Sequence, residues 1–109
     1  MSKYVQNTGK RQDGPGHYSV TMLNEENGCS AGLQMGYMIY ESAEYLSFAV
    51  HDDQEGFFVL EGAGFASIDG EETPIAPGDA IIVPVGKSHS FRKSADVPVL
   101  KMFSFHAKA

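Results

Sequence analysis

Residues 64–83 of the chain read GFASIDGEETPIAPGDAIIV, and this stretch indicates the fold. Two runs of strand-like composition flank Asp69-Gly70, a dipeptide that strongly favours a two-residue hairpin turn. Pro77-Gly78-Asp79 marks a second turn, and the apolar, β-branched run Ala80–Val83 follows it. The stretch therefore predicts three short strands joined by tight turns.

The rest of the chain continues this pattern of short apolar runs separated by turn residues. No segment carries a convincing helical period, and the expected strands recur at roughly the 8–12-residue spacing of all-β domains. The other expected strands cover residues 19–23, 33–40, 45–51, 56–60, 88–92 and 99–106. The pattern predicts an all-β fold, built as an antiparallel sandwich or barrel.

Length and composition indicate one globular domain. A chain of 109 residues leaves no room for a second hydrophobic core, and 42% hydrophobic with 20% charged residues is a globular composition. Residues 1–17 are polar and end in Asp13-Gly-Pro-Gly16, so we expect a flexible N-terminal segment there. Residues 18–109 are expected to form the single barrel domain.

Charge and hydropathy argue against several classes of partner. The net charge is −6 and there is no basic run, so nucleic acid is not an expected partner. No segment approaches the roughly 20 apolar residues that span a bilayer, and residues 1–13 do not resemble a signal peptide. Cys29 is the only cysteine, which excludes an intrachain disulfide. A cytoplasmic location is therefore expected.

Two segments carry side chains suited to metal binding. His51 and Glu55 lie four residues apart in the first segment, and His89 ends the second. Each histidine alone is more often an ordinary polar residue on a strand. Two imidazoles and one carboxylate together, however, form a set that binds divalent first-row metals while leaving positions open for substrate or dioxygen. The sequence therefore predicts a metal site formed by His51, Glu55 and His89.

The chain resembles the cupin superfamily over about residues 33–106, because both motifs of that superfamily occur in order. The matching residues are His51, Glu55 and Gly62 in the first motif, and Gly78, Pro84, Gly86 and His89 in the second. The resemblance implies a double-stranded β-helix, which is a jelly-roll barrel. It also implies that His51, Glu55 and His89 ligate the metal.

Three positions depart from the cupin motifs. Ala49 stands where the first histidine of a His-x-His pair is expected, Ala43 replaces a glycine, and Lys93 replaces an asparagine. Since alanine cannot ligate, the resemblance implies only three protein ligands, and water, a substrate atom or another side chain would fill the remaining position. No spacing argument places His17 or His106 near the metal.

The resemblance leaves two classes of function open. In the first, the protein is a metalloenzyme of dioxygenase, isomerase, decarboxylase or lyase type that acts on a small polar organic molecule. In the second, it is a non-catalytic module that binds or senses a small molecule. The metal would be iron, zinc, nickel or manganese, and the sequence singles out no catalytic side chain.

Alternation along the strands also predicts a homodimer. Phe48, Val50, Phe58 and Leu60 alternate with the inward-facing set, so they are expected to form one apolar patch on the outside of the barrel. Fully burying one such side chain contributes about 1.5–3 kcal/mol. A second subunit would cover this patch, and the N-terminal segment could cross over to it. The competing interpretation is that residues 24–32 of the same chain cover the patch.

Overall fold

The computed structural model describes residues 4–109, and its regular elements are almost all β-strands. Within these residues the helical structure is limited to one short 3-10 turn, η1 (Glu25–Asn27). The strands are β1 (Lys10–Gly14), β2 (His17–Leu23), β3 (Gln34–Tyr40), β4 (Gln54–Glu61), β5 (Gly64–Ile68), β6 (Glu71–Ile75), β7 (Ala80–Val83), β8 (His89–Lys93) and β9 (Leu100–Ala107). The predicted all-β class is confirmed.

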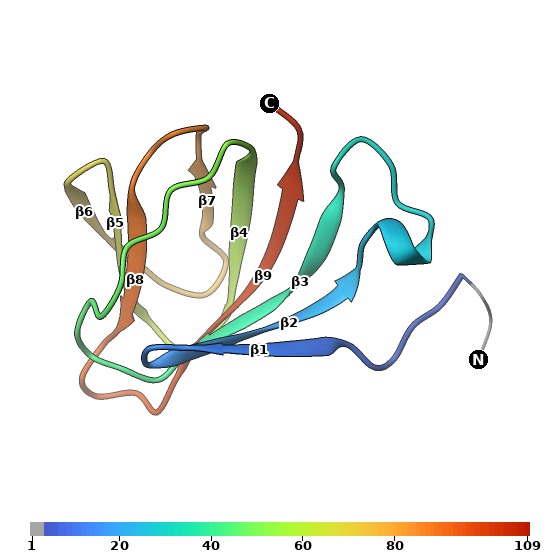
Figure 1. The fold of residues 1–109 in the computed structure, drawn as a ribbon. Coiled ribbons are helices and arrows are strands. Elements are labelled where there is room, and N and C mark those ends of the chain that lie inside the picture. The colour runs from blue at the N-terminus through green and yellow to red at the C-terminus, as the bar shows by residue number, and fades with distance from the viewer. Residues whose placement is uncertain (1–3) are drawn as a thin grey trace.

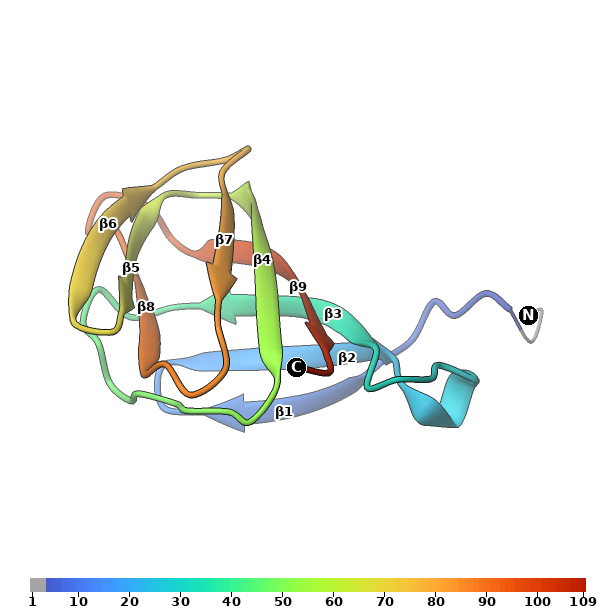
Figure 2. The same ribbon diagram turned by 90° about the horizontal axis from the view of Figure 1, so that it is seen from above.

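The strands form two antiparallel sheets whose inner faces pack against each other (Figures 1 and 2). The larger sheet has the order β1-β2-β3-β9-β4-β7, and the smaller has the order β6-β5-β8. The last strand, β9, lies between β3 and β4, so strands distant in sequence become neighbours. This arrangement confirms the predicted jelly-roll barrel.

The hydrophobic core fills one end of the barrel. Its buried members are Phe57, Val59, Ala66, Ile75, Val83, Phe91, Leu100 and Met102. Phe57 and Val59 point inward from β4, whereas Phe58 and Leu60 on the same strand are 42% and 48% exposed. The alternation predicted for this strand is therefore confirmed.

The expected hairpin between β5 and β6 and the expected turn before β7 are both present. Asp69 and Gly70 have φ angles of 51° and 80°, and they connect the paired residues Ile68 and Glu71. Two successive positive φ angles are the requirement of a type I′ turn, which explains why this dipeptide marks the hairpin. Gly78, with φ of 95°, lies in the turn before β7.

The prediction of a strand at residues 45–51 is wrong. The chain from β3 to β4 runs beside the free edge of β8 and touches it at separate points, as Figure 1 shows. Ser42 accepts a hydrogen bond from Lys93, Ala49 exchanges two with His89, and His51 accepts one from Gly86. The segment connects β3 and β4 of the larger sheet and passes the smaller sheet on the way. It therefore forms a single β-bridge to β8, at Ala49, instead of a continuous strand.

Within residues 1–17, the segment expected to be flexible, Lys10–Gly14 form the strand β1. This strand pairs with β2 of the same chain from Lys10↔Thr21 to Gly14↔His17. Pro15 and Gly16 (φ 66°) make the turn, an order that type II turns favour. β1 is an edge strand that is exposed along its whole length. It buries no side chain, so its sequence lacks the apolar residues that would mark it as a strand. Residues 1–3 of the expected segment lie outside the described part.

The four side chains expected to share one apolar patch are all exposed, but they lie in two places. Phe48 and Val50 flank the Ala49 bridge to β8 of the smaller sheet. Phe58 and Leu60 lie on the outer face of β4 in the larger sheet. Residues 24–32 leave Phe58 and Leu60 exposed, which contradicts the interpretation that this loop covers them.

The outer face of the larger sheet is apolar over three neighbouring strands. Phe58 on β4 is paired in register with Phe103 on β9, and the next pair on the same face of the sheet places Phe105 beside Gly56. Ile82 of β7 lies on the other side of Gly56 and is 56% exposed.

In the described residues, no helix is both long and apolar enough to cross a membrane.

Candidate metal centre

The same alternation that builds the core places a polar group at the other end of the barrel. On β4, Glu55 lies on the inward face one step before the core residue Phe57. On β8, His89 lies one step before Phe91. Side chains two residues apart on a strand share a face, so the core and the polar group are continuous.

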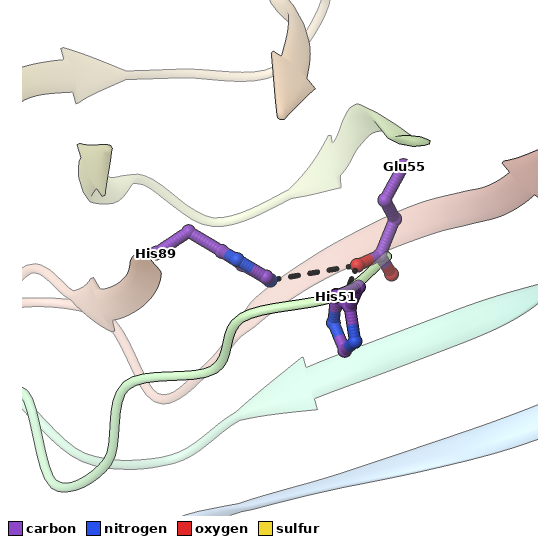
Figure 3. A group of neighbouring side chains, drawn as sticks. All are labelled: His51, Glu55 and His89. Atoms are coloured by element: carbon purple, nitrogen blue, oxygen red, sulfur yellow. Dashed lines mark ion pairs between the residues drawn. The ribbon is translucent and has the colours of Figure 1, made fainter. Parts of the chain in front are cut away.

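His51, Glu55 and His89 come together at this end of the barrel. Each offers one ligand atom, and the three atoms lie within 4.8 Å of one another. Glu55 Oε1 is 3.4 Å from His51 Nε2 and 3.5 Å from His89 Nε2, and dashed lines mark these ion pairs in Figure 3. The structure thus brings together the three residues that the sequence singled out, in an arrangement that could hold a metal ion.

Burial differs between the three side chains in a way that suits an open metal site. Glu55 and His89 are buried, whereas the side chain of His51 is 36% exposed. Ala49, which pairs with His89, also lines the cavity and offers no ligand atom. Three donors on one side and an open cavity on the other match a centre with free coordination positions.

Glu55 is held in its charged form. Burial alone would raise the pKa of this carboxyl group, but hydrogen bonds and charge interactions with His106 and His89 outweigh burial and lower the pKa to about 2. A metal ligand must be deprotonated, and Glu55 meets that requirement across the physiological range. Together with two imidazoles, the donor set therefore fits a divalent first-row metal.

His106 is a site residue that the sequence reasoning missed. It lies on β9 directly opposite Glu55 in the register, and its Nε2 is 3.0 Å from Glu55 Oε2. Its Nδ1 is 3.0 Å from Asp53 Oδ2. The hydrogen bond with Glu55 raises the pKa of His106 against the opposing effect of burial, with support from Asp53. Residues separated by an even number of positions on a strand share a face, so the buried Met102 on the same strand could have indicated that His106 points inward.

His17, the remaining histidine, lines the same cavity but does not contact the three ligand candidates. Its ring stacks on Tyr40 with centroids 4.9 Å apart, and its Nδ1 is 2.9 Å from the carbonyl oxygen of Pro15. Burial, followed by the nearby charge of Glu55, raises the pKa of Tyr40, so this side chain stays a neutral hydroxyl. Both residues line the cavity that also contains His51, Glu55 and His89.

The cavity beside the three ligand candidates has a volume of about 430 Å³. Hydroxyl and amide side chains contribute much of its polar lining, among them Gln12, Ser19, Thr21, Gln34, Ser47 and Ser104. Among the described residues, no lysine or arginine lines it. The cavity has the size and the polar anchors of a small-molecule site.

The sequence profile of the cupin domain matches residues 36–105, which is more than half of the chain. The chain therefore belongs to the cupin family. No curated protein matches this sequence.

Solved structures with the same fold include proteins of different activities. A predicted oxalate decarboxylase from Thermotoga maritima has a TM-score of 0.79 and 18% identity, over 96% of this chain and 99% of that chain. Salicylate 1,2-dioxygenase from Pseudaminobacter salicylatoxidans has a TM-score of 0.73 and 23% identity, over 86% and 27%. The FeII form of HppE has a TM-score of 0.71 and 15% identity, over 83% and 49%. At these identities the similarity shows a shared fold.

Proposed function

We propose that this chain is a metal-binding cupin that acts on a small polar organic molecule in the cavity beside His51, Glu55 and His89. The observation that carries this proposal is the convergence of both imidazoles on one oxygen of a buried, charged carboxylate at the wall of an open cavity. Iron, zinc, nickel and manganese all suit this donor set.

A divalent metal bound here would supply Lewis acidity, or a binding position for dioxygen, at the end of the cavity. The residues of the chain would balance the charge of the metal and orient the substrate. Glu55 offsets part of the metal charge, and the exposed side of His51 faces the space that a substrate would enter. The neutral hydroxyl of Tyr40 and the free Nε2 of His17 are placed to orient polar groups of that substrate.

Two reaction types are supported, dioxygenase-type oxidation and isomerisation of a small polar substrate. Two histidines and one carboxylate leave open positions of the kind used by non-haem iron oxygenases. A salicylate 1,2-dioxygenase with this fold supports the first reaction type, whereas isomerisation rests on membership of the cupin family. Binding or sensing without turnover is the alternative that the experiment below separates from catalysis.

The test begins with metal analysis of protein purified without added metal. We expect about one divalent ion per chain in the wild type, a sharp loss in His89→Ala, and no loss in His17→Ala. The two variants remove the same side chain from the same cavity, so a difference between them isolates the ligand role. Equal metal content in both would contradict the proposed site.

Metal identity and oxygen uptake then decide the type of function. Iron with substrate-dependent oxygen consumption supports a dioxygenase, whereas zinc, nickel or manganese with isomerised product supports an isomerase. A tightly held organic molecule, with no turnover under either assay, supports the binding module and contradicts the enzyme.

We also propose that the protein is a homodimer and that the outer face of the larger sheet is its interface. The exposed apolar side chains Phe58, Ile82 and Phe105 come from three adjacent strands of that sheet. Burying each would contribute about 1.5–3 kcal/mol, which a monomer would leave unrealised. A second copy of the chain offers the same apolar face and therefore suits it.

A further inference from the structure

We propose that His106, fixed by Asp53, is a positioning residue that holds one oxygen of Glu55 so that the carboxylate offers only its other oxygen to a metal. This inference rests on the proposed metal site and goes beyond it, because His106 lies outside both cupin motifs and Asp53 is not one of the matching residues of the first motif. It concerns how the chain orients its one carboxylate ligand.

The two oxygens of Glu55 face different groups. Oε1 is the atom toward which His51 and His89 converge, at 3.4 Å and 3.5 Å. Oε2 is 3.0 Å from His106 Nε2, the shortest of the three contacts. A carboxylate can bind a metal through one oxygen or through both. With Oε2 accepting a hydrogen bond from His106, Glu55 is preset to bind through Oε1 alone.

His106 itself is fixed from its far side. Asp53 Oδ2 lies 3.0 Å from His106 Nδ1, so each ring nitrogen faces a carboxylate and the ring cannot turn without losing a contact. The backbone adds a second constraint, since His106 and Glu55 are direct partners in the pairing of β9 with β4. Outer partners of this kind orient metal ligands and tune their affinity.

Asp53 has a feature that points to the same role. Its Oδ1 is buried and has no hydrogen-bond partner. A buried oxygen without a partner is rare and destabilises the fold. The contact between the other oxygen of Asp53 and the imidazole of His106 is therefore kept at a cost in stability. Asp53 precedes β4 by one residue, which ties the position of His106 to the start of the strand that carries Glu55.

A role as a fourth metal ligand fits the contacts less well. Among the described residues, the one group of three or more possible ligands whose donor atoms all lie within 4.8 Å of one another is His51, Glu55 and His89, without His106. The Nε2 of His106 is occupied by Glu55 Oε2, so ligation by His106 would require this hydrogen bond to break. Because Ala49 removes one ligand of the usual motif, correct orientation of the single carboxylate matters more.

The test uses the full chain loaded with cobalt(II), with affinity measured by competition against a chromophoric chelator. His106→Ala should weaken Co²⁺ binding by about 10–100-fold, and His106→Gln, whose amide can still donate to Glu55, should restore part of it. Asp53→Asn should weaken binding in the same direction by a smaller factor. The matched control is Asp52→Asn, which removes an exposed neighbouring carboxylate and should leave affinity unchanged.

A second readout separates positioning from general damage to the fold. In the infrared difference spectrum of the Co²⁺-loaded protein, the carboxylate bands should change from a one-oxygen to a two-oxygen binding pattern in His106→Ala. They should stay at the one-oxygen pattern in His106→Gln. If His106→Ala fails to fold, the same two measurements on Asp53→Asn and His106→Gln decide the question.

Three results would overturn the inference. Unchanged affinity and an unchanged carboxylate pattern in His106→Ala would remove any role for His106, while the metal site would stand. X-ray absorption showing three imidazoles in the wild type and two in His106→Ala would make His106 a ligand. A wild-type protein that binds no Co²⁺, Zn²⁺ or Fe²⁺ would overturn the proposed function, and this inference with it.

Discussion

Glu55 is the residue on which the other polar side chains of the site converge, and its ionisation should be visible in the stability of the metal-free protein. Its pKa in the folded state is about 2, below the reference value of 4.5. A lowered pKa stabilises the fold above the unfolded pKa, and this contribution is lost as the pH falls toward 2. Between pH 6 and pH 3 the loss should be about 2 kcal/mol.

Urea denaturation at several pH values tests this prediction against Glu55→Gln. The wild type should lose more free energy of unfolding between pH 6 and pH 3 than the variant, by about 2 kcal/mol, because the other carboxylates titrate in both proteins. Parallel pH profiles of the two proteins would show that Glu55 carries no such contribution.

At the scale of the elements, the turn between β4 and β5 should tolerate substitution far less than the turn between β5 and β6. Gly62 has φ of 78°, and a Cβ there would overlap the backbone oxygen of Val99. Gly70 has nearly the same φ, 80°, but a Cβ there would meet nothing within 4 Å. Gly70→Ala should therefore cost about 1–2 kcal/mol, the strain of a left-handed residue.

Gly62→Ala should cost at least about 2 kcal/mol more than Gly70→Ala, because a rigid backbone contact must also shift. Thermal or urea unfolding of the two variants gives the difference directly, and the Gly70 variant serves as the control for φ. Equal losses of stability would contradict a close approach of the 99–100 backbone to Gly62.

The elements also show which parts of the fold could be predicted from local sequence. The hairpin at Asp69-Gly70 and the inward face of Glu55 and Phe57 follow from turn chemistry and period-2 alternation, and both are confirmed. The segment 45–51 has strand-like composition, yet it forms one bridge, because its pairing depends on where β8 lies. Local patterns do not encode that long-range position.

The same limit explains His106 and β1. Placing His106 against Glu55 requires knowing that β9 inserts between β3 and β4, which is a property of the whole sheet. Lys10–Gly14 are polar and exposed, so no apolar alternation marks them as a strand. The residues of the cupin motifs could be predicted because turns and ligands keep a fixed spacing, whereas these partners come from tertiary pairing.

For the whole molecule, the apolar outer face of the larger sheet leads to a prediction about assembly. If two chains pair through this face, sedimentation at micromolar concentration should give a mass of twice the 11.8 kDa chain. Phe58→Asp should shift the protein toward monomer, because it places a charge beside Phe103 in the centre of the face. The expected weakening of the dimer is at least about tenfold.

Val50→Asp is the matched control, because Val50 is also an exposed apolar residue but flanks the bridge to β8 in the smaller sheet. It should leave the dimer intact. If Val50→Asp dissociates the dimer and Phe58→Asp does not, the interface lies on the smaller sheet instead. A wild-type protein that stays at 11.8 kDa on concentration would show that neither face pairs two copies, and that the exposed aromatic rings of β4 and β9 remain in contact with water.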